Sequence, residues 1–162
     1  MKKSIEEQQG LITLIQKGGI YPDIPGANPR EVLTHLIRTV PLSPSITQED
    51  LLKAVLEREA LMSTAMGKGI ALPHPRNPII TCPQEQCVII GFLQQPVDWK
   101  ALDGIGVHTL LLIVSSSAKS HLHTLSQITF LCQQEPFYHY LKNRASLDQI
   151  ITAIRGIEQS WH

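Results

Sequence analysis

The segment 108–115 constrains the fold of this chain more than any other. It reads His-Thr-Leu-Leu-Leu-Ile-Val-Ser, so apolar side chains fall on both faces of an extended backbone. Such a strand is stable only when both of its faces are covered, and helices are the usual cover. We therefore expect 108–115 to be a strand inside a layered α/β domain.

Helical and extended patterns surround this strand. Apolar residues at helical spacing predict helices at 4–17, 117–134 and 136–143. The buried face expected for the second of these helices contains Leu122, Leu125, Ile128, Thr129 and Cys132. Short apolar runs predict strands at 69–72 and 88–93, whereas the glycines and prolines of 20–26 and 62–78 indicate a turn-rich extended segment and a loop.

Capping residues mark three further helix starts. Asn28 precedes Pro29 and lies three residues before Glu31, Thr47 opens a second helix, and Ser146-Leu147-Asp148-Gln149 has the form of a capping box. The order of elements predicts one α/β domain over residues 1–162, a small mixed β-sheet flanked by helices on both sides.

Length and charge exclude several classes of protein. The chain has 162 residues and a formal net charge of zero, so it lacks the basic excess that nucleic-acid binding requires. No run of about 18 apolar residues is present, and Glu6, Glu7, Gln8 and Gln9 stand where a signal peptide has its apolar core. We therefore expect a cytoplasmic protein that neither enters the membrane nor binds nucleic acid.

The cysteines and tryptophans fit structural roles. Cys82, Cys87 and Cys132 are odd in number and form no C-x-x-C pair, which favours reduced thiols over disulfides. A zinc site built from His74, His121, His123 and a cysteine lacks the usual ligand spacing, and no G-x-S-x-G motif indicates a serine hydrolase. We expect no metal or cofactor, and we expect Trp99 and Trp161 to be buried.

His74 is the first candidate for chemistry. It lies between Pro73 and Pro75, which fix the backbone on both sides and exclude a continuous helix. A neutral imidazole is a good nucleophile near neutral pH and forms a phosphoramidate by attack on phosphorus. Hydroxyl and N–H donors for the phosphoryl oxygens are available nearby at Ser63, Thr64, Gly67 and Gly69. The alternative is a histidine on a rigid surface turn.

His121 is the second candidate. It falls near the start of the helix expected at 117–134, where the helix dipole favours an anion and disfavours a protonated imidazole. We expect it to be neutral if it is buried there. The alternative is an ordinary polar residue at the start of a helix.

These residues carry a family resemblance. Glu59, Met66, Gly67 and the run Ile70-Ala71-Leu72-Pro73-His74 fill the places of an active-site pattern. In that pattern an acidic or amide residue precedes an apolar residue, a glycine and then aliphatic-Ala-aliphatic-Pro-His. The chain resembles the type-2 enzyme IIA domains of the phosphoenolpyruvate-dependent sugar phosphotransferase system. The likeness covers about residues 11–158, with further matches at Asp98-Trp99, Leu102-Asp103-Gly104, Val107 and His121-Leu122.

The resemblance implies a phosphotransferase component that carries a phosphoryl group on a histidine. His74 would receive the group from the small carrier HPr or its nitrogen-branch paralogue, and His121 would orient or stabilise it. Arg58 matches an arginine beside the phosphoryl site, and its guanidinium can grip two oxygens. Ser63 and Thr64 would line the site. Arg76, in the sequence His-Pro-Arg-Asn-Pro, is similar to a subset of regulatory members and would add a second cation.

The resemblance is compatible with two functions for the phosphorylated protein. The phosphoryl group could pass to an enzyme IIB during sugar uptake, or it could regulate partner proteins. A free-standing domain would fit regulation slightly better, although sugar-specific enzyme IIA can also be free-standing. One departure favours a third alternative, because Pro75 replaces the usual small residue after the active histidine and removes an N–H donor. That alternative is a phosphorylation-silent interaction module that has kept the fold.

Overall fold

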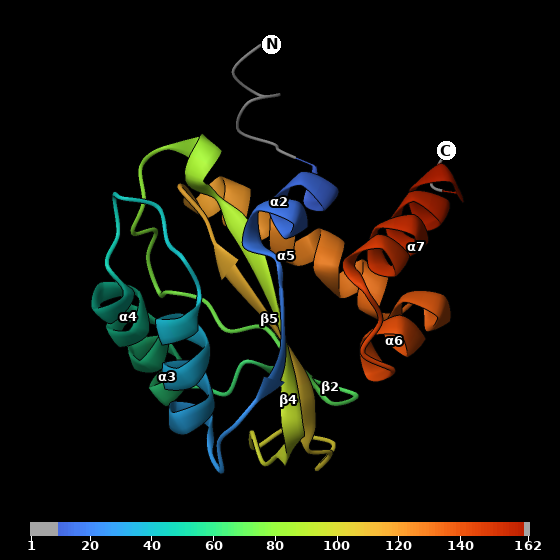
Figure 1. Ribbon diagram of the computed structural model, residues 1–162, viewed down its shortest axis with the longest axis horizontal. Coiled ribbons are helices and arrows are strands. Elements are labelled where there is room, and N and C mark those ends of the chain that lie inside the picture. The colour runs from blue at the N-terminus through green and yellow to red at the C-terminus, as the bar shows by residue number, and fades with distance from the viewer. Residues whose placement is uncertain (1–9, 161–162) are drawn as a thin grey trace.

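The computed structural model describes residues 10–160, the side chain of Ser160 excepted (Figure 1). The described helices are α2 (Leu11–Gly18), α3 (Pro29–Thr39), α4 (Gln48–Leu61), α5 (Ala118–Cys132), α6 (Glu135–Lys142) and α7 (Leu147–Ser160), with a 3₁₀ turn, η1, at Pro83–Glu85. The described strands are β1 (Ile20–Ile24), β2 (Ala65–Gly67), β3 (Ile70–Ala71), β4 (Cys87–Val97) and β5 (Val107–Val114). The part of the helix expected at 4–9, like Trp161, lies outside the described residues.

The strands form one mixed sheet in the order β1-β4-β5-β3-β2. β4 pairs with β5 antiparallel, β1 and β3 run parallel to their neighbours β4 and β5, and β2 pairs with β3 antiparallel. The central strand expected from the apolar run at 108–115 is confirmed, because every residue of β5 except His108 is buried.

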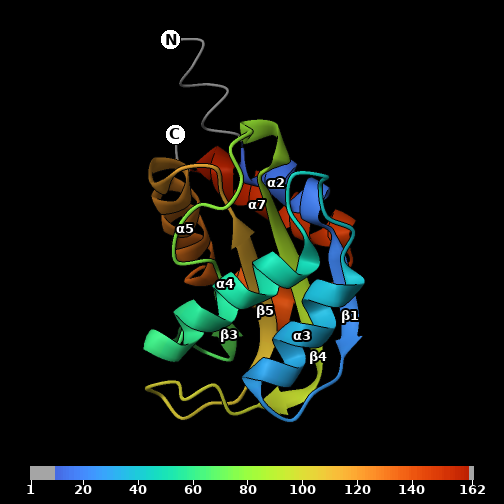
Figure 2. The same ribbon diagram turned by 90° about the vertical axis from the view of Figure 1, so that its left-hand side faces the viewer.

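Helices cover both faces of this sheet, as the sequence predicted (Figures 1 and 2). α3 and α4 pack on one face, whereas α2, α5, α6 and α7 pack on the other. Alternate residues of β5 enter the two cores: Leu110 and Leu112 face α3 and α4, while Leu111 and Ile113 face the opposite layer. The period of two in a strand therefore distributes one apolar run between two hydrophobic cores.

The expected helix caps are confirmed. Asn28 Oδ1 accepts from the Glu31 N–H at 2.9 Å, and Thr47 Oγ1 accepts from the Asp50 N–H at 3.1 Å. Ser146 and Gln149 form the reciprocal capping box, with distances of 3.0 and 3.3 Å. Each bond satisfies a backbone donor that the first turn of a helix leaves unpaired.

Two expectations need correction. The segment 20–26, read as turn-rich, contains strand β1, which tolerates Pro22 because an edge strand can lack one N–H donor. Within the loop expected at 62–78, residues Ala65–Gly67 form β2. This three-residue strand is too short to show a period, and it owes its extended form to pairing with β3.

The buried face of α5 also differs from the expectation. Ile128 and Cys132 are buried as expected, but Leu122 is 64% exposed and Leu125 and Thr129 are only partly buried. The other buried positions of α5 are Ser120, Thr124 and Leu131. The first two turns of α5 thus present small polar residues to the protein, and the larger apolar ones enter the core only further along. A hydrophobicity pattern favours large residues and therefore misplaces this face.

Gly18 allows α2 to approach β4 closely, which gives a test of the packing. A Cβ at this position would lie 1.9 Å from the Val88 carbonyl oxygen, a backbone atom that cannot move aside. We expect Gly18→Ala to lower the free energy of unfolding by about 2 kcal/mol, as overpacked sites do. The matched control is Gly156→Ala in α7, where nothing lies within 4 Å and a gain of about 0.5–1 kcal/mol is expected. Urea unfolding measures both, and equal stabilities would contradict the close contact.

Candidate functional site

The site lies at the edge of the sheet where the parallel strands β3 and β5 both end. The Ile113 N–H donates to the Pro73 carbonyl at 3.0 Å, so the chain continues beside β5 after β3 has ended. His74 follows immediately. β5 ends at Val114, and Ser117 caps α5 by accepting from the Ser120 N–H at 3.1 Å, which places His121 at the start of that helix.

The two candidate histidines meet here. The ring centroids of His74 and His121 lie 4.5 Å apart, with the rings tilted by 41°, and both side chains are partly buried. Arg58, near the end of α4, is close enough for its charge to act on both rings. Its Nη1 donates to the Met62 carbonyl at 2.8 Å, which ties the guanidinium to the end of its own helix. Three residues far apart in the sequence are thus gathered at one place.

One hydrogen bond decides the tautomer of His74. Its Nδ1 lies 2.8 Å from the Leu72 carbonyl oxygen, and a carbonyl oxygen can only accept. Nδ1 therefore carries the proton, and in the neutral ring Nε2 holds the lone pair. The backbone leaves Nε2 as the nucleophilic atom.

Both histidines are disposed to be neutral. Burial lowers the pKa of His74, opposed by the Leu72 hydrogen bond, while Arg58 lowers it further and Glu59 raises it. Burial, His74 and Arg58 together lower the pKa of His121 from 6.5 to about 4. The expectation of a neutral His121 agrees with this environment.

The hydroxyls of Ser63 and Thr64 are engaged within the protein. Ser63 Oγ donates to the Trp99 carbonyl at 2.5 Å, and Thr64 Oγ1 donates to Glu59 Oε1 at 2.6 Å. Thr64 is nevertheless next to the site, because its carbonyl accepts from the Leu72 N–H at 3.0 Å. In this arrangement both hydroxyl protons are donated to acceptors within the protein.

Gly67 is the last residue of β2, and Gly69 lies in the turn that leads into β3, at the opposite end of β3 from His74. Both have positive φ, 95° and 81°, and a Cβ on Gly69 would come within 2.4 Å of the His108 ring. In this turn the Lys68 N–H donates to the Asp103 carboxylate at 2.8 Å, and the Ile105 N–H donates to it as well. These two hydrogen bonds lower the pKa of Asp103. The structure does not bring these glycines to the histidine pair; they shape a tight turn.

The sequence matches a known family over most of its length. The family is described as "Phosphoenolpyruvate-dependent sugar phosphotransferase system, EIIA 2", and the match covers residues 13–156. The chain belongs to this family.

Relatives of this enzyme IIA domain have two kinds of name. The chain is 27% identical over 147 residues to a "PTS system fructose-specific EIIABC component" of Bacillus subtilis, and the match covers 89% of this chain but only 23% of that protein. It is 26% identical over 151 residues to a "Nitrogen regulatory protein" of Pseudomonas aeruginosa, covering 91% of this chain and 96% of the relative.

Solved structures confirm the fold. The nitrogen regulatory protein IIA-Ntr from Neisseria meningitidis superposes with a TM-score of 0.71 at 22% identity, covering 93% of this chain and 99% of that one. The mannitol IIA of Escherichia coli gives a TM-score of 0.66 at 19% identity, covering 86% and 96%. The single-domain fold of a mixed sheet between helices is therefore that of enzyme IIA proteins.

A cavity of about 220 Å³ lies beside the histidine pair of this enzyme IIA domain. It is lined by His121 and Leu122 of α5, by Ile113, Ser115 and Ala118, and by the segment Pro75-Arg76-Asn77-Pro78. Arg76 is exposed and lines the same cavity as His121. The structure thus brings Arg76 to the neighbourhood of the pair, on the side of His121.

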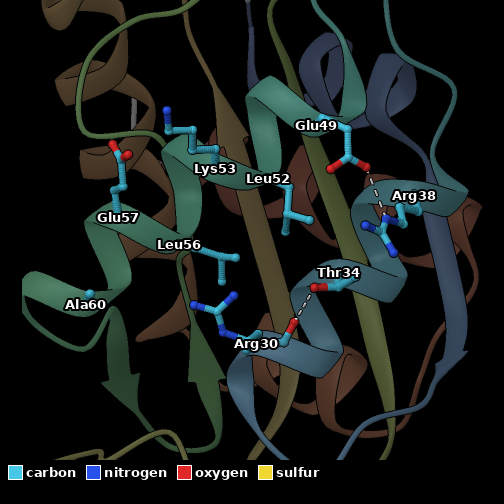
Figure 3. A pocket seen from close by; sticks show the side chains of 9 residues that line it. All are labelled: Arg30, Thr34, Arg38, Glu49, Leu52, Lys53, Leu56, Glu57 and Ala60. Atoms are coloured by element: carbon cyan, nitrogen blue, oxygen red, sulfur yellow. Dashed lines mark hydrogen bonds and ion pairs between the residues drawn. The ribbon is translucent and has the colours of Figure 1, made fainter.

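A groove of about 500 Å³ between α3 and α4 is a separate feature (Figure 3). Arg30, Arg38 and Lys53 alternate there with Glu49 and Glu57, and Arg38 pairs with Glu49 at 3.2 Å. None of the described histidines lines this groove.

Among residues 10–160 no group of three or more His, Cys, Asp or Glu side chains is placed to hold a metal ion. No helix of that part of the chain is long and apolar enough to span a bilayer.

Glu59 is the residue of the site that the sequence reasoning did not assign. It was noted only as the acidic position of the family pattern, yet its carboxylate accepts from the Thr64 N–H, the Thr64 hydroxyl and the Trp99 indole. Trp99 is 1% exposed, so the expectation of a buried aromatic is confirmed for it. In the sequence, the only sign of a role for Glu59 is its position in the family pattern.

The lowered pKa of His121 can be measured. We expect its ring protons to titrate with a pKa of about 4 in the folded protein, against 6.5 in the urea-unfolded chain. As pH falls from 6.5 towards 4, the unfolded state binds this proton first, so the free energy of unfolding decreases. NMR titration tests the pKa, and urea unfolding of His121→Ala tests the linkage, because the variant should lose this part of the pH dependence. A folded-state pKa near 6.5 would contradict the burial of His121.

Proposed function

We propose that this chain is a phosphohistidine carrier of the phosphotransferase system, working in the cytoplasm. His74 accepts a phosphoryl group from an HPr-like carrier, or from its nitrogen-branch paralogue, and passes it on or uses it to regulate partner proteins. The observation that carries the proposal is the pair of His74 and His121, with Nδ1 of His74 held by the Leu72 carbonyl. Family membership supports the same reaction class.

The proposed transfer begins with the lone pair on His74 Nε2. This atom attacks the phosphorus of the donor phosphohistidine, so a new N–P bond forms while the donor N–P bond breaks. The electron pair of the broken bond returns to the donor imidazole. The His74 ring gains positive charge in this step, and the Nδ1–H bond to the Leu72 carbonyl stabilises that charge.

Two groups serve the transferred phosphoryl in this proposal. Arg58 supplies a permanent positive charge, and a guanidinium can bind two phosphoryl oxygens at once. His121 is neutral before transfer, because burial, His74 and Arg58 lower its pKa. A phosphoryl group on His74 places negative charge beside it and raises that pKa, so His121 becomes a better donor when the phosphoryl arrives.

The other residues expected to bind the phosphoryl group differ in the part that this proposal gives them. Arg76 is proposed as a second cation, since it lines the cavity next to His121. Ser63 and Thr64 contribute their backbone to the wall of the site, because both hydroxyls have partners within the protein. Gly67 and Gly69 are left out of the proposed site, because they lie at the far end of β3.

The acceptor of the phosphoryl group is open to two proposals. Relatives carry names from fructose transport and from nitrogen regulation. An Escherichia coli mannitol enzyme IIA of the same fold, at a TM-score of 0.65, has been solved in complex with phosphorylated enzyme IIB. Transfer to an enzyme IIB cysteine and regulation of a partner protein both begin with phosphorylated His74.

Pro75 favours one competing function. It is buried directly after His74 and has no N–H to offer a phosphoryl oxygen. A module that binds partners without being phosphorylated would tolerate this residue at no cost. Measurement of phosphoryl acceptance separates this alternative from the carrier.

The decisive experiment is intact-protein mass spectrometry after incubation with phosphoenolpyruvate, enzyme I and HPr. We expect a gain of one phosphate that is lost in mild acid, and we expect His74→Ala to abolish it. His123→Ala, which removes another imidazole of α5, is the matched control and should accept phosphate as the wild type does. No gain, with the upstream proteins active on a known acceptor, would support the silent module. A phosphate on His74→Ala would place the site elsewhere.

The two supporting residues make a separate prediction. We expect Arg58→Ala and His121→Ala each to slow phosphoryl acceptance by about 10–1000-fold, the range of one lost charge-assisted contact. Rapid-quench measurement of the transfer rate tests this. Arg38→Ala removes an arginine whose ion pair with Glu49 is exposed on both sides, and it should leave the rate unchanged. Wild-type rates in both site variants would remove these residues from the site.

A further inference from the structure

The carboxylate of Glu59 is the most heavily engaged acceptor beside the histidine pair. Its Oε2 accepts from the Thr64 N–H at 2.7 Å, and its Oε1 accepts from the Thr64 hydroxyl at 2.6 Å and from the Trp99 indole at 3.0 Å. Hydrogen bonds to a charged acceptor are about twice as strong as those between neutral groups. Glu59 therefore determines where Thr64 and Trp99 lie.

These bonds join three separate segments. Glu59 belongs to the last turn of α4, Thr64 lies just before β2, and Trp99 follows β4. The Ser63 hydroxyl closes a ring by donating to the Trp99 carbonyl. Trp99 is 1% and Thr64 8% exposed, so most of this network is shielded from water. A network of this kind fixes geometry because each member has its partners.

The network is connected to His74 through Leu72. The Leu72 N–H donates to the Thr64 carbonyl at 3.0 Å, and the Leu72 carbonyl accepts from His74 Nδ1 at 2.8 Å. The peptide groups of Leu72 are thus held on one side by Thr64 and hold His74 on the other. A path of hydrogen bonds leads from the Glu59 carboxylate to the imidazole.

We propose that Glu59 is a positioning residue for phosphoryl transfer. By anchoring Thr64, it keeps the Leu72 carbonyl where it fixes the proton on His74 Nδ1 and leaves Nε2 free to attack. This inference rests on the proposed carrier function, but the tautomer of His74 can be measured without any transfer. Displacement of a reacting group by about 1 Å can cost on the order of 100-fold in rate.

The charge of Glu59 gives a second readout. The groups that act on the His74 ring are Arg58 and Glu59 from α4, His121 from α5 and the Leu72 carbonyl. Arg58 lowers the pKa of His74, whereas Glu59 raises it. Removal of the carboxylate charge therefore lowers this pKa further. Because the neutral ring attacks phosphorus, the acidic limb of the pH–rate profile should move to lower pH.

The test compares Glu59→Gln with Glu57→Gln. Both remove one negative charge from α4, but Glu57 is exposed on the groove between α3 and α4 and has no part in the network (Figure 3). We expect Glu59→Gln to slow phosphoryl acceptance by about 10- to 100-fold and to shift the acidic limb downward. Glu57→Gln should match the wild type in both measurements.

Nitrogen-15 NMR of the histidine rings provides the independent measurement. In the wild type we expect His74 to carry its proton on Nδ1, and in Glu59→Gln we expect the Nε2–H tautomer to gain population. Thr64→Val, which removes one hydroxyl and keeps the backbone N–H bond, should show a smaller change in the same direction. If Glu59→Gln does not fold, the comparison of Thr64→Val with the wild type tests the proposal instead.

The outcomes separate the two proposals. If the wild type takes no phosphate from active upstream proteins, the carrier function fails, and the NMR comparison still decides the role of Glu59. If the wild type is phosphorylated but Glu59→Gln equals Glu57→Gln in rate, pH profile and tautomer, the positioning role is wrong. A loss of stability in Glu59→Gln with an unchanged tautomer and pH profile would also overturn it, since this is what a merely structural residue gives.

Discussion

The backbone pairing along β5 is the interaction on which the rest of this structure depends. β5 bonds to β4 on one side and to β3 on the other, and the Ile113 N–H extends the second pairing to Pro73. That last bond sets where His74 leaves the sheet. Because α5 begins just beyond the end of β5, the same strand also sets where His121 starts its helix. Main-chain hydrogen bonds thus set where the backbones of the two histidines lie relative to each other.

The site gathers three groups that can all be positive, and burial makes this arrangement stable. Two protonated imidazoles beside a guanidinium would repel one another strongly in a partly buried place. Burial instead lowers the pKa of both histidines, so Arg58 is the one permanent cation of the three. In the proposed carrier, a phosphoryl group on His74 would reverse the balance, because its negative charge favours protonation of His121. This arrangement keeps one permanent cation for the proposed phosphoryl group while avoiding the cost of excess positive charge.

The sequence predicted those parts of the structure that follow from local patterns. The caps at Asn28, Thr47 and Ser146 and the apolar strand at 108–115 depend on residues close together in the chain, and each was confirmed. β1 and β2 were not predicted as strands, because their extended form comes from pairing with distant partners. The meeting of His74 and His121 was expected only from the family resemblance. The engagement of Glu59 could not be predicted, because its partner Trp99 lies 40 positions away.

In the proposed carrier, Pro75 limits the ways in which the site can bind a phosphoryl group. The residue after the histidine can offer its N–H to a phosphoryl oxygen, but proline has none. Binding must then rely on side chains, and the candidates near the pair are Arg58, His121 and Arg76. Side chains lose more freedom on binding than backbone groups do, so their positions need support from the surrounding protein. The bond of Arg58 to the Met62 carbonyl and the anchoring of the neighbouring wall by Glu59 supply such support. A site with proline at this position therefore depends more on the end of α4 than a site with a backbone donor would.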